Sequence, residues 1–218
     1  DWLVIPTEAD PPIHTAYRAA LNPKFAPQNM AAMRDQVRER AKVLIARFKD
    51  RGHCDFVDEF SEKYPINIVL DLLDLPQDRM AEFLTWEKEM LHTNDWEVRG
   101  NAVRKVKAYL MGVIEERQKN PGDDYISKIF DNEVDGRKWN VTEVFGHCFN
   151  LFTGGLDTVT TMLGNIFNWL ARNPDRQDEL RANPKLLRNA FDESLRWDSP
   201  SRMAGRITTC DVTIDDLV

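Results

Sequence analysis

Residues 140–172, NVTEVFGHCFNLFTGGLDTVTTMLGNIFNWLAR, contain the longest helical pattern in the chain. The pattern begins with Asn140 and, three residues later, Glu143, a pair typical of the capping box at a helix N-terminus. Apolar residues follow at helical spacing until Asn173-Pro174, because the residue before a proline is disfavoured in the helical conformation. At 1.5 Å per residue a helix of roughly 30 residues is about 45 Å long, so we expect it to cross the whole molecule.

The middle of this predicted helix is unusual. Gly154 and Gly155 each cost about 1 kcal/mol relative to alanine inside a helix. Glycine lets another group approach the backbone closely, and the hydroxyl of Thr158 can leave the helix for another acceptor. One side of the helix carries a stripe of small and polar residues: Asn150, Gly154, Asp157, Thr158 and Thr161. The stripe favours a functional site, although a tight helix crossing with a satisfied threonine would produce the same pattern.

The composition of the 218-residue chain limits the classes of function. Hydrophobic residues make up 42% and charged residues 30%, enough for one sizeable domain with a core. The 29 Lys and Arg against 36 Asp and Glu give a net charge of −7, which argues against nucleic acid as a partner. No apolar run reaches the length of a membrane span, and the first residues lack the basic segment of a signal peptide.

The three cysteines, Cys54, Cys148 and Cys210, are odd in number and have no paired spacing. This argues against disulfides, and the lack of a Cys-x-x-Cys pair argues against zinc or an iron–sulfur cluster. We therefore expect a reducing compartment and a cytoplasmic location.

The rest of the chain is also predicted to be mainly helical. Amphipathic patterns cover residues 27–49, 64–73, 77–92, 95–119, 174–182 and 184–197. Val134 to Arg137 predicts a turn that joins two short strands, and the alternation after Pro200 predicts further strands. We expect a mainly α fold with minor β, in which residues 1–218 form a single domain organised around the long central helix.

Four stretches of the chain resemble one family, and each is weak alone. They are Asp10-Pro11-Pro12-Ile13-His14-Thr15 with Arg18, the central FTGGLDTVT of residues 152–160, Glu193-Ser194-Leu195-Arg196, and Pro200 with Arg206. In this order and at these separations they resemble the cytochrome P450 haem-thiolate monooxygenases, and most of all the soluble bacterial members of the camphor-hydroxylating type. The resemblance implies a cytochrome P450 fold.

The resemblance also implies that the chain is an internal fragment. Members of the family are about twice as long and begin with a β-rich portion that has no counterpart before Asp1. Their cysteine ligand lies in a Phe-x-x-Gly-x-x-x-Cys-x-Gly loop, a context that none of the three cysteines has. We expect the haem ligand beyond Val218 and no metal ligand within this chain.

The resemblance assigns roles to the residues of the central stripe. Asp157 and Thr158 would be the acid–alcohol pair that delivers protons to activated oxygen. Gly154 and Gly155 would leave space for oxygen and the face of the haem.

Outside the central helix, His14, Arg18 and Arg206 would donate to the propionates of haem b. Glu193 and Arg196 would form a buried structural ion pair that supports the ligand loop. The residues expected to border the substrate are Asn150, Thr153, Arg202, Met203 and Ala204.

The implied function is a haem-dependent monooxygenase that inserts one atom of O2 into a small terpenoid or aromatic molecule, by hydroxylation or oxidative dealkylation. Polar groups among the substrate residues suggest a substrate with an oxygen function that one of them fixes. No flavin or nicotinamide motif is present, so electrons would come from a ferredoxin with its reductase. An acidic ferredoxin could dock on a basic patch to which Arg18, Lys24 and Arg34 contribute.

Two other readings remain open. A helical, magnesium-dependent terpene cyclase would need acidic clusters to chelate a diphosphate, and the candidates are Asp71, Asp74, Asp95 and Asp123-Asp124. A non-catalytic helical interaction module would explain the length of the chain but not the glycine–acid–threonine stripe.

Overall fold

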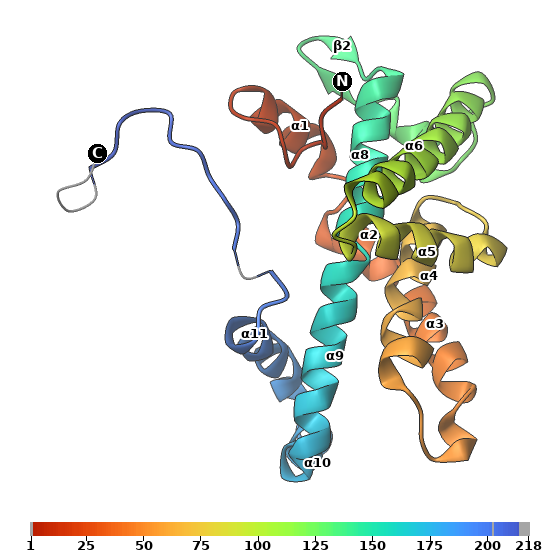
Figure 1. Cartoon of the computed structure of the whole chain (residues 1–218), viewed down its shortest axis with the longest axis vertical. Coiled ribbons are helices and arrows are strands. Elements are labelled where there is room, and N and C mark those ends of the chain that lie inside the picture. Colours follow the sequence, from red (N-terminus) through yellow and green to blue (C-terminus); the bar gives the residue numbers. More distant parts are fainter. Residues whose placement is uncertain (1, 202, 214–218) are drawn as a thin grey trace. The chain divides into compact units, whose positions relative to one another are not determined.

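The computed structural model describes residues 2–201 and 203–213. The chain forms two compact units, one up to Gly164 and one from Asn165 onward. The described elements of the first unit are α1 (Ile13–Leu21), α2 (Pro27–Ala32), α3 (Arg34–Ala46), η1 (Lys49–Arg51), η2 (Val57–Ser61), α4 (Lys63–Leu72), η3 (Gln77–Arg79), α5 (Met80–Leu91), α6 (Trp96–Lys119), α7 (Tyr125–Ile129), β1 (Glu133–Val134), β2 (Arg137–Lys138), α8 (Val141–Gly154) and the start of α9 (Asp157–Arg172) (Figure 1). The second unit holds the rest of α9, α10 (Pro174–Ala182), η4 (Pro184–Leu186) and α11 (Leu187–Trp197).

The core of the first unit lies where α4, α5, α6 and α8 pack together. Phe83 of α5 and Phe152 of α8 are almost fully buried, and their rings meet edge to face at 5.8 Å. Trp2 packs edge-on against Phe145 and Phe149, one turn apart on α8. Burying such a side chain stabilises the fold by about 1.5–3 kcal/mol, so these contacts hold α8 in the core.

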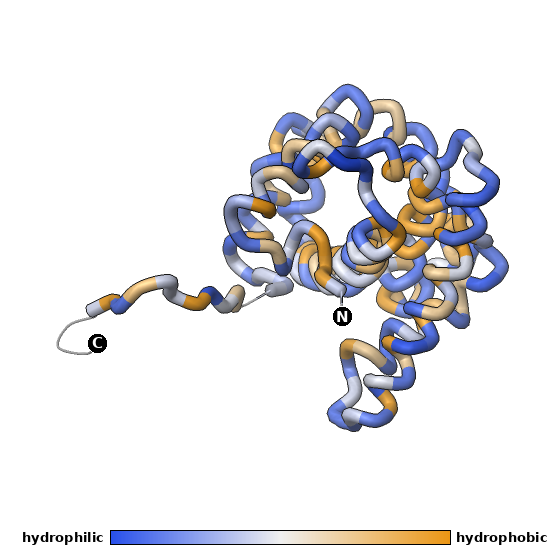
Figure 2. Tube along the Cα trace, turned by 90° about the horizontal axis from the view of Figure 1, so that it is seen from above, coloured by the Kyte–Doolittle hydropathy of each residue, from blue (hydrophilic) through white to orange (hydrophobic). Residues whose placement is uncertain are grey.

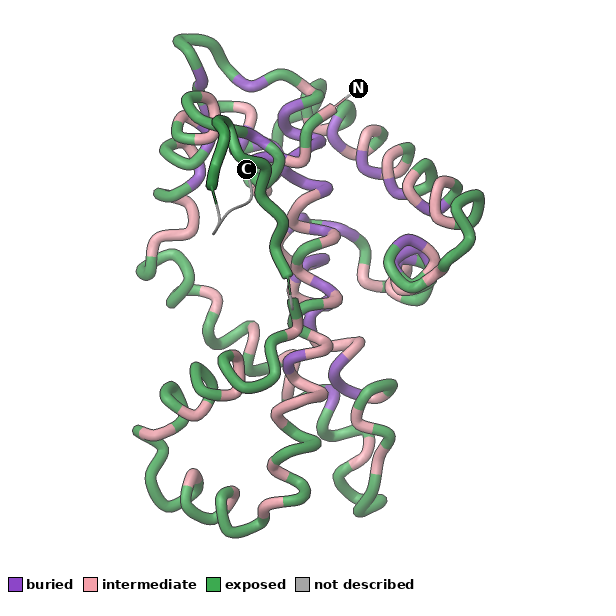
Figure 3. The backbone as a smooth tube through the Cα atoms, turned by 60° about the vertical axis from the view of Figure 1, so that its left-hand side comes forward, coloured by how far each residue is buried: buried purple, intermediate pink, exposed green. Residues whose placement is uncertain are grey.

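Burial differs between the two units. Hydrophobic and hydrophilic residues alternate along the helices in Figure 2, as expected for amphipathic elements. All the buried residues of the described chain belong to the first unit, and Figure 3 shows only half-buried and exposed residues in the helices of the second. Within the described residues, each helix is too short or too polar to cross a bilayer.

The N-terminus of α8 is held by the predicted capping box, which the structure confirms. Asn140 Oδ1 accepts from the Glu143 amide at 3.0 Å, and Glu143 Oε2 accepts from the Asn140 amide at 2.8 Å. The buried Glu143 carboxylate also accepts from Arg137 at 2.7 Å and from the Tyr17 hydroxyl at 2.8 Å. Burial opposes the charged form, but these hydrogen bonds outweigh it and hold the pKa of Glu143 below its usual range.

The predicted central helix is interrupted, which corrects the expectation of one continuous helix over 140–172. α8 ends at Gly154 and α9 begins at Asp157, with a turn at Gly155 and Leu156. The Gly155 amide still donates to the Leu151 carbonyl at 3.1 Å, while the Thr158 hydroxyl donates to the Gly154 carbonyl at 2.9 Å. Two glycines followed by a threonine that bonds to the backbone are enough to bend or break a helix.

The fold class is confirmed as mainly α with little β. The predicted turn joins β1 and β2, which pair antiparallel with Glu133 opposite Lys138 and Val134 opposite Arg137. The strands predicted after Pro200 are absent from the described residues there, because an alternating segment forms a ladder only where another strand pairs with it. The expectation that residues 1–218 form a single domain stays a prediction.

Candidate functional site

Gly154 and Gly155 at the helix break have different surroundings. A Cβ placed on Gly154 would meet no atom within 4 Å beyond its own helix and its chain neighbours. A Cβ on Gly155 would lie 2.8 Å from the Leu151 carbonyl oxygen and 2.8 Å from Cγ2 of Val69 in α4. Gly155 therefore allows α4 to pack against the break, whereas Gly154 faces open space.

Thr158 lies on the open side, one turn after Gly154. Its hydroxyl donates to the Gly154 carbonyl, and the side chain is otherwise exposed. The hydroxyl oxygen keeps its lone pairs free to accept a hydrogen bond from a molecule placed beside Gly154.

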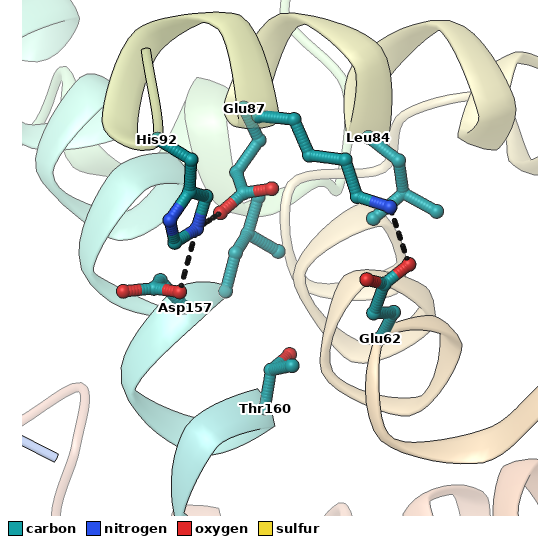
Figure 4. Close-up of a pocket in the computed structure, with 8 residues that line it drawn as sticks. Glu62, Leu84, Glu87, His92, Asp157 and Thr160 are labelled. Carbon is teal, nitrogen blue, oxygen red and sulfur yellow. Dashed lines mark hydrogen bonds and ion pairs between the residues drawn. The ribbon is translucent and has the colours of Figure 1, made fainter. Parts of the chain in front are cut away.

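Asp157 points into a cavity on a different side of the helix. Its Oδ1 lies 3.0 Å from Nε2 of His92, just after the end of α5, and its side chain is 35% exposed (Figure 4). Glu87 of α5 lies on the other side of the same imidazole, with Oε1 3.6 Å from Nε2. Burial raises the pKa of Glu87, and the Asp157 carboxylate adds to this, while His92 acts against it.

The other wall of the cavity is formed by the residues around the end of η2. The cavity has a volume of about 310 Å³ and is lined by Glu62, Leu84, Glu87, Lys88, His92, Leu156, Asp157 and Thr160. Lys88 Nζ binds Glu62 at 2.8 Å (Figure 4). The Thr160 hydroxyl donates to the Ser61 carbonyl at 2.9 Å. η2 is a π-helix, and such local widening is frequent at functional sites.

His92 and Glu87 were not predicted from the sequence. They are five residues apart at the end of an amphipathic helix, in no recognisable motif, and their partner Asp157 is 65 residues further along the chain. The only signal available was the presence of ionisable groups near a helix end, which is common on solvated surfaces.

The predicted substrate residues of α8 are engaged within the protein. Asn150 Oδ1 accepts from the Thr7 hydroxyl at 2.9 Å, so the Asn150 amide nitrogen is the group left to donate. The Thr153 hydroxyl donates to the Phe149 carbonyl at 2.9 Å. Both side chains are half-buried.

His14 and Arg18, the predicted propionate donors of the first unit, share one face of α1. His14 is half-buried and Arg18 exposed, and neither side chain forms a hydrogen bond or ion pair with a described residue. Two cationic or cation-capable groups one turn apart without an acidic partner are suited to an anionic ligand.

The remaining predicted residues lie in the second unit. Arg196 binds Glu193 through two hydrogen bonds of 2.6 and 2.7 Å, and hydrogen bonding from Arg196 lowers the pKa of Glu193. The side chains of Glu193 and Arg196 are 61% and 65% exposed within this chain, and the burial expected for the pair in the whole protein stays a prediction. Met203, Ala204 and Arg206 are exposed in a segment without helix or strand, and Arg202 lies outside the described residues.

The acidic residues that a terpene cyclase would need have local roles instead. Asp71 binds Arg40 at 2.5 Å, and Asp74 binds Arg117 at 2.9 Å. Asp95 and Asp124 cap the N-termini of α6 and α7. Asp123 binds Lys128 at 2.8 Å. A diphosphate–magnesium site is therefore not favoured.

Comparison with known proteins identifies the family of this chain. The sequence model of the family described as Cytochrome P450 matches residues 53–218. The chain belongs to the cytochrome P450 family.

Relatives from bacteria match nearly the whole chain. A probable cytochrome P450 127A1 of Sinorhizobium fredii is 34% identical over 215 residues, which cover 98% of this chain and 51% of that protein. Cytochrome P450 130 of Mycobacterium tuberculosis is 33% identical over 95% of this chain and 53% of its own. Among solved structures, the ligand-free cytochrome P450 TbtJ1 has a TM-score of 0.85 at 30% identity, covering 96% of this chain and 57% of that one. The chain thus spans about half the length of the curated relatives that it matches.

Proposed function

We propose that the whole protein is a haem-dependent monooxygenase that inserts one atom of O2 into a small organic substrate. The observation that carries the proposal is the helix break, where Gly154 faces open space and the Thr158 hydroxyl lies one turn away. Membership of the cytochrome P450 family supports the same reaction. One relative, 30% identical over 210 residues, is named 6-deoxyerythronolide B hydroxylase.

Two groups of residues have the properties that a haem site requires. Gly154 leaves room for a flat group beside the helix, and His14 and Arg18 are free to bind carboxylates such as the propionates. Cys148 is fully buried, and burial raises the pKa of its thiol, so it is unsuited to act as a thiolate ligand. We place the cysteine ligand beyond Val218. When bound, the haem would supply the activation of O2.

The proton path runs through this chain's own side chains. Asp157 contacts the solvent-accessible cavity and can take up a proton there, while Thr158 holds its hydroxyl on the face of Gly154. Successive residues of a helix point in directions about 100° apart, so the proton must pass between them through a rotation of Asp157 or through a water molecule. The contact with His92 sets the starting position of the Asp157 carboxylate. Such a relay would typically contribute 10²–10⁴-fold to the rate.

The proposed substrate class rests on Asn150, and the proposed electron donor rests on three basic residues. The amide nitrogen of Asn150 is free to donate, which supports a substrate with an oxygen function, terpenoid or aromatic in class. Electrons would come from a ferredoxin with its reductase, docking near Arg18, Lys24 and Arg34. The camphor-hydroxylating subtype and the cytoplasmic location stay predictions.

The test of the proposed function is the replacement of Thr158 by alanine in the full-length protein. We expect product formed per reduced cofactor to fall and hydrogen peroxide to rise, because the hydroxyl that directs proton delivery is lost. Thr85→Ala is a matched control, since the Thr85 hydroxyl also donates to a carbonyl four residues earlier at 2.9 Å but lies on α5. Unchanged peroxide yield in Thr158→Ala, in a protein that binds haem normally, would contradict the assigned role.

A further inference from the structure

The cavity beside Asp157 contains more negative charge than its cation neutralises. Three carboxylates line it, from Glu62, Glu87 and Asp157, and one ammonium group, from Lys88. Counting these four side chains alone, three negative charges and one positive charge leave a formal charge of −2. Lys88 is bound to Glu62 at 2.8 Å, so the excess is located on Glu87 and Asp157.

Glu87 differs from the other carboxylates of the cavity in its burial and its lack of a hydrogen-bond donor among the described residues. Its residue is 5% exposed, and its carboxylate accepts no hydrogen bond from any residue that the structure describes. The side chain points into the cavity toward His92 (Figure 4). A largely buried carboxylate without a hydrogen-bond donor is costly, because burial removes part of its hydration and no protein donor replaces it.

The donor atoms of Glu87, His92 and Asp157 converge on one point. Nε2 of His92 lies 3.0 Å from Oδ1 of Asp157 and 3.6 Å from Oε1 of Glu87, and all three donor atoms lie within 4.8 Å of one another. Ligand atoms of a tetrahedral ion at 2.0–2.2 Å are separated by roughly 3.3–3.6 Å. The His92–Glu87 separation of 3.6 Å already has that value, and the His92–Asp157 separation of 3.0 Å is about 0.3 Å short of it.

We propose that Glu87, His92 and Asp157 form a binding site for a divalent transition-metal ion of the Zn²⁺ class, which would link the end of α5 to the start of α9. One imidazole nitrogen and two carboxylate oxygens suit Zn²⁺ and its neighbours in the first transition series. Mg²⁺ and Ca²⁺ prefer oxygen ligands throughout, and the set contains no soft thiolate for Cu(I). The open cavity leaves the fourth position to water.

Zn²⁺ binding to the full-length, haem-loaded protein tests this proposal directly. After removal of bound metal with a chelator, calorimetric titration with Zn²⁺ should show one more site in the wild type than in His92→Ala. Glu87→Gln, which keeps the shape of the side chain, should weaken that site at least about 10-fold. Anomalous diffraction from Zn²⁺-soaked crystals should place the ion between the three side chains.

Two variants serve as matched controls. Glu89→Gln removes a carboxylate from the same helix that already binds Lys105 at 3.1 Å, and His53→Ala removes an exposed imidazole elsewhere. Both should keep the number of sites and the affinity of the wild type. Equal numbers of sites in the wild type and His92→Ala, or no Zn²⁺ bound up to about 1 mM, would overturn the proposal.

One consequence rests on the proposed function. If Asp157 takes part in proton delivery, Zn²⁺ should slow turnover in the wild type more than in His92→Ala. Zn²⁺ that binds with the expected variant pattern but leaves turnover unchanged would contradict the role of Asp157 and not the metal site.

Discussion

Gly154 and Gly155 are neighbours in the sequence, yet only one of them is needed for packing. Gly155→Ala would bring a methyl group to 2.8 Å from both the Leu151 carbonyl and Val69. We expect it to lower the free energy of unfolding by about 1–3 kcal/mol through overpacking. Gly154→Ala has no such contact and should leave stability unchanged or raise it by up to about 1 kcal/mol. Chemical denaturation of both variants measures the difference.

The two alanine substitutions also distinguish an effect on packing from an effect on function. If the open side of Gly154 is where oxygen and haem lie, Gly154→Ala should reduce turnover although its stability is retained. A Gly154→Ala protein that is as active as the wild type would show that the space is not used.

His147 gives a prediction for acid stability. Burial lowers the pKa of its imidazole to about 4. Nδ1 faces the Ile5 carbonyl at 3.3 Å and must donate to it, so Nε2 accepts from the Tyr125 hydroxyl at 2.8 Å. In the unfolded chain the pKa of this imidazole is near 6.5. The free energy of unfolding is therefore highest at neutral pH. It falls by about 3 kcal/mol in total as the pH drops from about 6.5 to 4, because the unfolded chain then binds the proton more readily than the folded one.

The measurement is the free energy of unfolding at several pH values between about 7.5 and 4.5. His147→Gln should be less stable at neutral pH but should lose less stability on acidification. His53→Gln changes an exposed histidine and should follow the wild type. A pH dependence that is identical in His147→Gln and the wild type would show that another group dominates.

At the scale of elements, the start of α8 depends on one carboxylate that joins three segments. Glu143 accepts from its own cap residue Asn140, from Arg137 of β2 and from Tyr17 of α1. Glu143→Gln would turn amide hydrogens toward these donors, and we expect a loss of about 1–3 kcal/mol in unfolding free energy. Glu133→Gln, on the exposed position of β1, should change stability little. Equal stability of both variants in denaturation would contradict this account.

Local signals explain which elements could be predicted. The capping box of Asn140 and Glu143 and the proline of α10 act within a few residues, and the structure places these helix starts as predicted. The turn at Asp135-Gly136 was also predictable, since both residues adopt the positive φ that such turns require. The break at Gly155 was indicated as a weak point, but the close approach of Val69 from α4 to this residue is a contact that the local sequence does not contain.

In the candidate site, too, local sequence signals predicted some residues, and contacts between distant elements decided the others. Asp157 and Thr158 could be identified because their types and order match a family motif. His92 and Glu87 could not, because their meeting with Asp157 is a property of how α5 packs near the start of α9. The predicted burial of Glu193 and Arg196 depends on surroundings beyond their own helix, and within this chain both remain exposed.

At the scale of the whole molecule, the net charge and the local charge around Arg18 and Arg34 lead to different expectations for the docking of an acidic electron donor. The chain carries a net charge of −7, which would repel an acidic electron donor at long range. Arg18 and Arg34 are nevertheless exposed and without an acidic partner among the described residues, and Lys24 lies between them in sequence. A local basic patch can guide docking at distances below the Debye length of about 8–10 Å, where the distant acids are screened.

We therefore expect Arg34→Glu in the full-length protein to lower kcat/KM for an acidic ferredoxin by roughly 3- to 10-fold at low ionic strength. The deficit should shrink as salt is added, because screening removes the contribution of exposed charges. Arg104→Glu is the matched control, an exposed arginine on α6 that binds Asn101 and does not belong to the patch. Steady-state kinetics across a salt series measures both variants. Equal losses in Arg34→Glu and Arg104→Glu would mean that net charge alone sets the association rate, and the donor would then have to dock elsewhere.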